Sequence, residues 1–179
     1  MATLKGVTLV ALVLFALSIF APPAVGPAQA QMIAVTACGQ TLGAPGMYQL
    51  VTDIGPCPSN GVNITSSNVT FDLGNFTISG DPGTCSVNIT YDGILVSGPV
   101  SGVKIMNGTI SSFNDGVDLS FVTSSSVHGV VIKDACFFGV AVGNSQKVSV
   151  SGNMITGAGT DGVGIGGSST QVSSIELEG

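Results

Sequence analysis

The chain has 179 residues, of which 44% are hydrophobic and only 8% are charged, and its formal net charge is −6 at pH 7. It contains four lysines and no arginine, so it lacks the basic surface with which proteins bind nucleic acid or anionic lipid. After Ala30, β-branched residues, glycine and serine dominate and strong helix formers are rare, which predicts a domain built almost wholly of strands.

The N-terminal segment 1–30 has the three parts of a secretory signal peptide. Lys5 is its only charge, an apolar run extends from Val7 to Phe20, and the triplet Ala28–Ala30 has the small-x-small form of a cleavage site. The run is shorter than the roughly 20 apolar residues that a membrane span needs; an uncleaved anchor is the alternative. We expect a mature protein that is secreted, extracellular or periplasmic, with no membrane span and a net charge of about −7, from three lysines and ten acidic residues.

Four cysteines follow the signal segment. Cys38 and Cys57 lie within residues 31–60, which we expect to form an N-terminal capping segment, and we expect these two cysteines to pair because an exported chain retains disulfides. Closing a loop of this length stabilises a domain by about 3 kcal/mol in the loop-entropy description. Whether Cys85 and Cys136 also pair is left open. No CxxC spacing occurs and the chain has one histidine, so we expect no metal site at the cysteines.

A 23-residue internal repeat occupies positions 61–179. Gly93, Gly116, Gly139 and Gly162 recur at this constant spacing, and each opens an apolar alternation, as in DGILV and DGVDL. Gly61 opens an earlier copy, GVNI, which lies farther from Gly93 than one repeat. The nine extra residues fit an insertion at 80–88.

Each repeat contains a second alternating piece, as at 69–73, 103–105, 130–132 and 148–150, and asparagine, aspartate or glycine follows it. These residues tolerate left-handed backbone conformations and form tight corners between short strands. One such unit cannot bury its apolar side, whereas stacked units with strands ~4.8 Å apart can. The sequence therefore predicts an all-β chain folded as a right-handed parallel β-helix, a solenoid of about five coils. A β-sandwich is the alternative, although it does not demand a fixed glycine period.

The first coils resemble the pectate-lyase-like superfamily, and in particular exported bacterial and archaeal proteins with right-handed β-helix repeats. The residues that carry the resemblance are Cys38-Gly39, Pro45–Leu50, Asp53-Ile54, Cys57, Gly61–Ile64 and Asn68–Gly80. The resemblance extends from about Cys38 to Gly179 and implies the fold. It does not imply one activity, because this fold hosts lyases, hydrolases, epimerases, adhesins and binding proteins.

The stretch Phe113–Ser120 reads FNDGVDLS and places Asp115 and Asp118 around a glycine. It resembles a catalytic motif of polygalacturonases, which share the expected fold and hydrolyse their substrate with paired carboxyl groups. The resemblance implies two further acids and a histidine in the following coils, but Phe137–Phe138 and Asp161 occupy those places, and the expected arginine is absent. We interpret Asp115 and Asp118 as repeat residues, with a catalytic role as the alternative.

Asp92, Asp115 and Asp161 each precede a repeat glycine and are expected to stack at one corner. Such a column could bind a cation, with Ca²⁺ as the candidate, or sugar hydroxyls; the alternative is that they are turn aspartates without a ligand. The segment 157–164 also resembles one copy of a Ca²⁺-binding nonapeptide repeat. We expect His128 to be a surface residue. Sequons occur at Asn63, Asn68, Asn75, Asn88 and Asn107.

These features predict a non-catalytic binding or structural module that contacts polysaccharide or envelope protein through its lateral surface. The alternative is a degenerate or truncated carbohydrate-active enzyme, a polysaccharide lyase or glycoside hydrolase. A third hypothesis is periplasmic copper-site maturation, since some proteins of that system carry these repeats. The final segment 171–179 reads as a strand cut off in mid-coil, so we expect a partial copy of a longer solenoid or self-association through this last coil.

Overall fold

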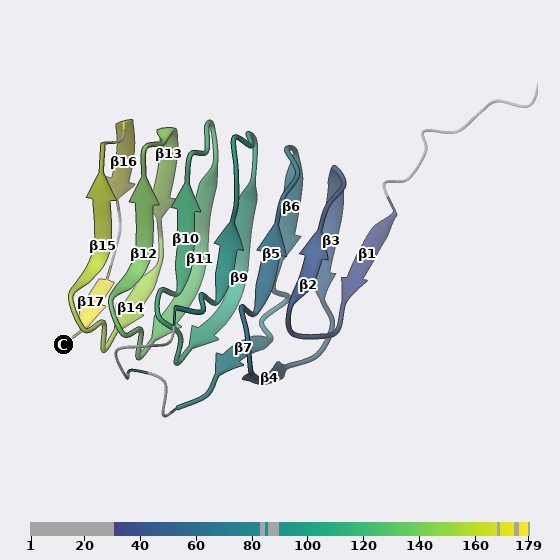
Figure 1. Ribbon diagram of the computed structural model, residues 1–179, viewed down its shortest axis with the longest axis horizontal. Coiled ribbons are helices and arrows are strands. Elements are labelled where there is room, and N and C mark those ends of the chain that lie inside the picture. Colours follow the sequence, from purple (N-terminus) through teal and green to yellow (C-terminus); the bar gives the residue numbers. More distant parts are fainter. Residues whose placement is uncertain (1–30, 83–84, 86–89, 168, 174–175, 179) are drawn as a thin grey trace, which may run out of the picture.

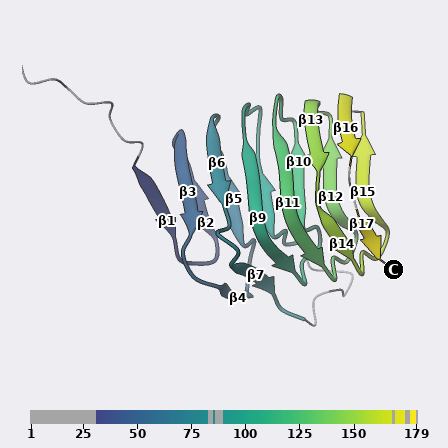
Figure 2. The ribbon, with the colours of Figure 1, turned by 180° about the vertical axis from the view of Figure 1, so that it is seen from behind.

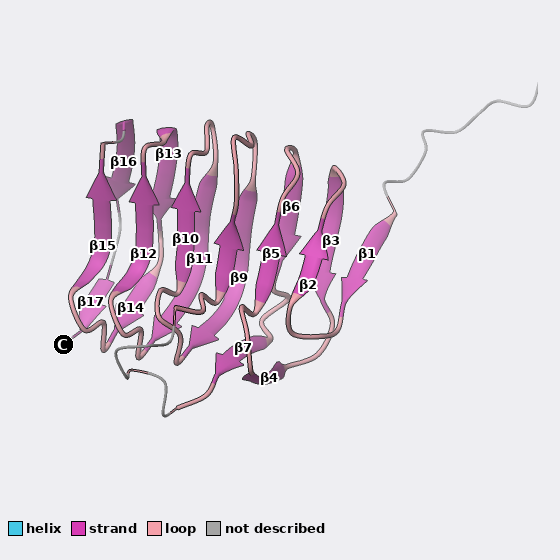
Figure 3. Cartoon of the chain, in the orientation of Figure 1, coloured by secondary structure: helices cyan, strands magenta, loops and turns pink. Residues whose placement is uncertain are grey.

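The computed structural model describes residues 31–82, 85, 90–167, 169–173 and 176–178; the expected signal peptide lies outside them. Every regular element in this part of the chain is a strand (Figure 3). The strands are β1 (Met32–Val35), β2 (Gln40–Leu42), β3 (Gly46–Leu50), β4 (Ile54–Cys57), β5 (Val62–Ile64), β6 (Val69–Asp72), β7 (Thr77–Gly80), β8 (Ile94–Val96), β9 (Lys104–Ser111), β10 (Val117–Ser120), β11 (Ser126–Lys133), β12 (Phe138–Gly143), β13 (Gln146–Ser151), β14 (Met154–Thr156), β15 (Asp161–Gly166), β16 (Ser169–Ser173) and β17 (Glu176–Glu178).

The strands stack into a parallel β-solenoid of about five turns, as the sequence predicts (Figures 1 and 2). Its first face is the sheet β2-β5-β8-β10-β12-β15. Its second face contains β1, β3, β6, β13 and β16 together with the first halves of β9 and β11. Its third face contains β4, β7, β14 and β17 and the second halves of the same two long strands. All of these pairings are parallel.

The repeat glycines form one column at the start of the first-face strands, and the 23-residue spacing is confirmed. The N–H of each following residue donates to the glycine carbonyl of the next coil, as from Ile94 to Gly116 at 3.0 Å. A Cβ built on Gly116 would lie 2.5 Å from the Gly139 carbonyl oxygen and 2.5 Å from Ile132 Cγ2. Glycine recurs here because neighbouring coils approach too closely for a side chain.

Alternate strand residues point inward and fill the solenoid. In the first face, Ile94, Val117 and Val140 are register neighbours and have no exposed surface. The corner between the second and third faces has a left-handed residue, which is asparagine in two coils (φ of 64° at Asn75 and 58° at Asn107) and glycine in the next two (Gly129 and Gly152). The predicted corner role of these asparagines is therefore confirmed.

Two disulfides tie the corners of the solenoid. Cys38 and Cys57 are bonded, and so are Cys85 and Cys136, 51 residues apart, which joins the insertion to a later coil. Much of the insertion lies outside the described residues. The expected capping segment contributes β1 to β4, of which β2, β3 and β4 pair with β5, β6 and β7. Disulfides are typical of oxidising compartments, and no helix among the described residues is long and apolar enough to span a membrane.

Candidate functional site

The candidate site lies on the outer side of the first face. Along β10, the completely buried Val117 and Leu119 alternate with Asp118 and Ser120, which therefore face outward. Their register neighbours on β12 and β15 are all small: Ala141, Gly143, Gly164 and Gly166. Because glycine has no side chain, glycines at outward-facing positions leave a depression in the face of the sheet.

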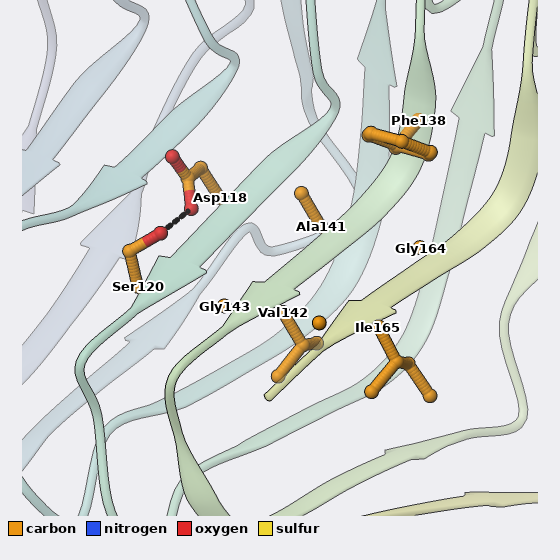
Figure 4. A pocket seen from close by; sticks show the side chains of 9 residues that line it. Asp118, Ser120, Phe138, Ala141, Val142, Gly143, Gly164 and Ile165 are labelled. Carbon is orange, nitrogen blue, oxygen red and sulfur yellow. Dashed lines mark hydrogen bonds between the residues drawn. The ribbon is translucent and has the colours of Figure 1, made fainter. Parts of the chain in front are cut away.

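A hollow of about 340 Å³ results over β10, β12 and β15 (Figure 4). The aromatic side chain at its rim is Phe138, at the start of β12. Its ring lies so close to Gly164 that an added Cβ there would stand 2.6 Å from two ring carbons. Gly164 thus leaves room for the ring, and the hollow combines an aromatic ring with exposed backbone.

Asp118 and Ser120 supply polar groups at the opposite side of the hollow from β15. The Ser120 hydroxyl donates to Asp118 Oδ1 at 2.7 Å, and both side chains are half-buried (Figure 4). This bond fixes the orientation of the carboxylate and leaves its second oxygen free of any hydrogen bond within the described residues. The hollow therefore presents a held carboxylate, a hydroxyl and an aromatic ring over a floor of small residues.

Two members of the expected aspartate column, Asp92 and Asp115, have a structural role. Asn60 Oδ1 accepts the Asp92 N–H at 2.9 Å, Asp92 Oδ1 accepts the Asp115 N–H at 3.3 Å, and Asp115 Oδ1 accepts the Phe138 N–H at 2.9 Å. Each side chain thus satisfies a backbone donor of the next coil. Phe138 interrupts the column, so Asp161 lies two coils from Asp115 and is exposed.

Burial and mutual repulsion change the acidity of this column. Burial, followed by the charges of Asp115 and Asp118, raises the pKa of Asp92 to about 7. Burial also raises the pKa of Asp115, the Phe138 N–H opposes this, and the charge of Asp118 adds to it. Three carboxyl groups therefore lie near one another, with Asp118 lining the hollow and Asp92 only 6% exposed.

The two aspartates of FNDGVDLS have different roles in the structure. Asp115 is engaged by the next coil, whereas Asp118 lines the hollow. Sequence reasoning missed Ser120, Phe138 and the glycine floor as site residues. The available signal was the 23-residue alignment, which puts a phenylalanine at position 138 where the neighbouring coils have aspartate.

The other expected sites are described only in part. His128 is exposed, and its register neighbours on the second face are Met106 and Ser151. Its Nδ1 lies 2.9 Å from the Ser151 carbonyl oxygen. Among the described residues no group of three His, Cys, Asp or Glu side chains is placed to hold a metal ion, so the Ca²⁺ and copper hypotheses stay predictions. The exposed sequon asparagines are Asn68, Asn75 and Asn107, and Asn88 lies outside the described residues.

Comparisons with known protein families, with curated proteins and with solved structures give no match to this chain.

Proposed function

We propose that this protein is an exported, non-catalytic solenoid that binds a polysaccharide in the hollow over β10, β12 and β15. The observation that carries the proposal is the combination of the Phe138 ring, the Asp118 carboxylate and the Ser120 hydroxyl in one hollow. Its volume of about 340 Å³ lies in the range of small-molecule sites. The resemblance of the first coils to exported pectate-lyase-like proteins and the two disulfides support export.

The chemistry of the hollow suits a sugar. A pyranose ring has an apolar face of C–H groups that stacks on an aromatic ring, and hydroxyls around its edge that donate to a carboxylate. Asp118 is a charge-assisted acceptor for such hydroxyls, and the glycine backbones of β12 and β15 allow the ring to approach closely.

The charge of the protein narrows the class of polysaccharide. The mature chain has three lysines and ten acidic residues, and the polar rim of the hollow is itself a carboxylate. A polyuronate would meet repulsion from both. We therefore expect a neutral or amino-sugar polymer.

Calorimetric titration of the purified protein with cello-, chito-, manno- and galacturono-oligosaccharides tests the proposal. We expect one of the uncharged or amino-sugar series to bind and the galacturono-series not to bind. Asp118→Ala removes the charged acceptor and is expected to weaken binding about tenfold or more, since hydrogen bonds to charged groups contribute about 1.5–3 kcal/mol. Asp161→Ala, which removes an exposed carboxylate outside the hollow, is the matched control. Tight binding of the galacturono-series, or equal binding by Asp118→Ala, contradicts the proposal.

Glycoside hydrolysis is the second candidate, and one observation favours it. Asp115, whose pKa is raised by burial, lies near Asp118, and paired carboxyl groups in different environments are what acid–base hydrolysis uses. Reducing ends released from the bound polysaccharide, and lost in both Asp115→Asn and Asp118→Asn, would establish this activity in place of simple binding.

A further inference from the structure

Phe121 departs from the recurring composition of the corner that follows each first-face strand. This corner residue has a left-handed backbone in four successive coils, with φ of 90° at Gly98, 60° at Phe121, 51° at Asn144 and 59° at Gly167. Glycine and asparagine adopt this conformation readily, whereas a bulky side chain is an outlier there. Phenylalanine at 121 is therefore unfavourable for the local backbone.

Packing does not compensate for this strain. The Phe121 side chain is 58% exposed, the largest exposed fraction among the large apolar side chains that the structure describes, and it is outside the hydrophobic core. Its N–H donates to the Gly143 carbonyl at 2.9 Å, but Asn144 makes the same bond to Gly166 at 2.8 Å, so the corner does not need an aromatic ring. Backbone strain that packing does not offset is characteristic of functional positions.

The position of Phe121 relates it to the hollow. Phe121 directly follows Ser120 and is hydrogen-bonded to Gly143, and both of these residues line the hollow. Phe138 lies at the other end of the same strands. In register, Phe138 corresponds to residue 115 of the preceding coil, six residues before Phe121. At ~3.3 Å per residue, the two aromatic residues are about 20 Å apart along the strand direction.

We propose that Phe121 is the second aromatic platform of the glycan site, and that the ligand is an extended, uncharged or amino-sugar oligosaccharide lying along β10 and β12 from Phe138 to Phe121. This inference rests on the function proposed above. The separation of the two aromatic residues requires a chain of several sugar rings, because one ring spans only a fraction of that length. Asp118 and Ser120, between the two rings, accept hydroxyl hydrogens from the middle of the chain.

The test compares wild type with Phe121→Asn, which places at 121 the residue already present at the equivalent position 144. The probes are a hexasaccharide and a disaccharide of the series that binds. We expect Phe121→Asn to weaken binding of the hexasaccharide about tenfold, the scale of one aromatic anchor, and to leave disaccharide binding unchanged. Its thermal midpoint should equal or exceed that of wild type, because the corner loses its strain. Val51→Ser, at an exposed apolar residue of the first coils, controls for general loss of apolar surface.

The outcomes separate this inference from the proposed function. Equal hexasaccharide binding by wild type and Phe121→Asn overturns the role of Phe121 alone. A lower thermal midpoint for Phe121→Asn also overturns it, since the ring would then be structural. Absence of saccharide binding by wild type overturns both, and a protein captured by wild type and lost in Phe121→Asn would then identify Phe121 as a protein-docking residue instead.

Discussion

Replacing Asp92 by asparagine is expected to stabilise the solenoid at neutral and alkaline pH. Asp92 is 6% exposed. Among the residues whose side chains the structure describes, no other acidic residue is buried. Burial, then Asp115 and Asp118, raises its pKa from 3.8 to about 7. The folded protein therefore disfavours the charged form of Asp92, whereas the unfolded chain does not.

The direction and size of the pH effect follow from this difference in pKa. Below about pH 3.8 the carboxyl group is protonated in both states and has no effect on stability. Between about 3.8 and about 7 only the unfolded state loses the proton, so the free energy of unfolding falls by about 1.4 kcal/mol per pH unit. Above about pH 7 the loss is complete, at about 4 kcal/mol.

Asparagine removes the charge and keeps one acceptor oxygen in place of the two with which Asp92 accepts the Asp115 backbone N–H and the Asn114 side-chain amide. Asn60 already occupies the equivalent position in the preceding coil, where its Oδ1 accepts the Asp92 N–H at 2.9 Å. In Asp92→Asn the amide oxygen is expected to accept the Asp115 N–H in the same way. The variant should exceed wild type by up to about 4 kcal/mol at pH 8 and match it near pH 3.5.

Urea unfolding with the disulfides intact, followed by circular dichroism at pH 3.5, 5.5 and 8, measures the difference. Asp161→Asn, at the exposed equivalent position two coils from Asp115, is the control and should show no such pH-dependent gain. A gain of equal size at pH 3.5 and pH 8, or a less stable Asp92→Asn at pH 8, would refute the argument that burial of a charge at this position weakens the fold.

Three further predictions concern the repeat and its covalent ties. Gly116→Ala places a Cβ 2.5 Å from a backbone oxygen of the next coil and should lower the free energy of unfolding by about 3 kcal/mol, whereas Gly166→Ala, with nothing within 4 Å, should be neutral in the same urea assay. Leu119→Ala empties a completely buried position and should cost about 2–5 kcal/mol; a loss below about 1 kcal/mol would contradict the packed interior. The double variant Cys85→Ser/Cys136→Ser releases a loop closed over 51 residues and should lose about 4 kcal/mol, which unchanged urea midpoints would disprove.

The fold was predictable because each coil constrains the next at the same place. Gly116 must be glycine since the backbone of the following coil passes over it, and this requirement recurs with the 23-residue period and is visible in the sequence. The corner asparagines, such as Asn107, are visible for a similar reason, because few residues tolerate a φ of 58°. The pairing of Cys85 with Cys136 was not predictable, since it joins the insertion to a coil that is distant in sequence.

The candidate site was predictable only in part. The order of residues indicates that Asp92 and Asp115 stack, but it does not show that their carboxylates accept N–H groups of the next coil or that one of them is buried. The hollow depends on the ring of Phe138 lying over Gly164, which belongs to another coil. Such a contact depends on rotamers and on neighbouring strands and leaves no periodic signal.

Phe138 and Phe121 lie at opposite ends of the strands under the hollow, and at both positions the chain departs from its own repeat. The residue before each repeat glycine is a polar acceptor in three coils, Asn60, Asp92 and Asp115, and is Phe138 in the next. An acceptor at 138 would bind the Asp161 N–H. That N–H donates to the Phe137 carbonyl oxygen instead, at 3.3 Å. The corner after each first-face strand has Gly98, Asn144 and Gly167 in three coils, and Phe121 in the coil after that of Gly98. The left-handed backbone at Phe121 is unfavourable for a bulky side chain, and the two departures occur in successive coils, at opposite ends of the strands that carry Asp118 and the hollow. A sequence that specifies a fold breaks its local rules chiefly at functional positions, and the coincidence of two departures around one hollow is the reason for proposing the glycan site on these coils.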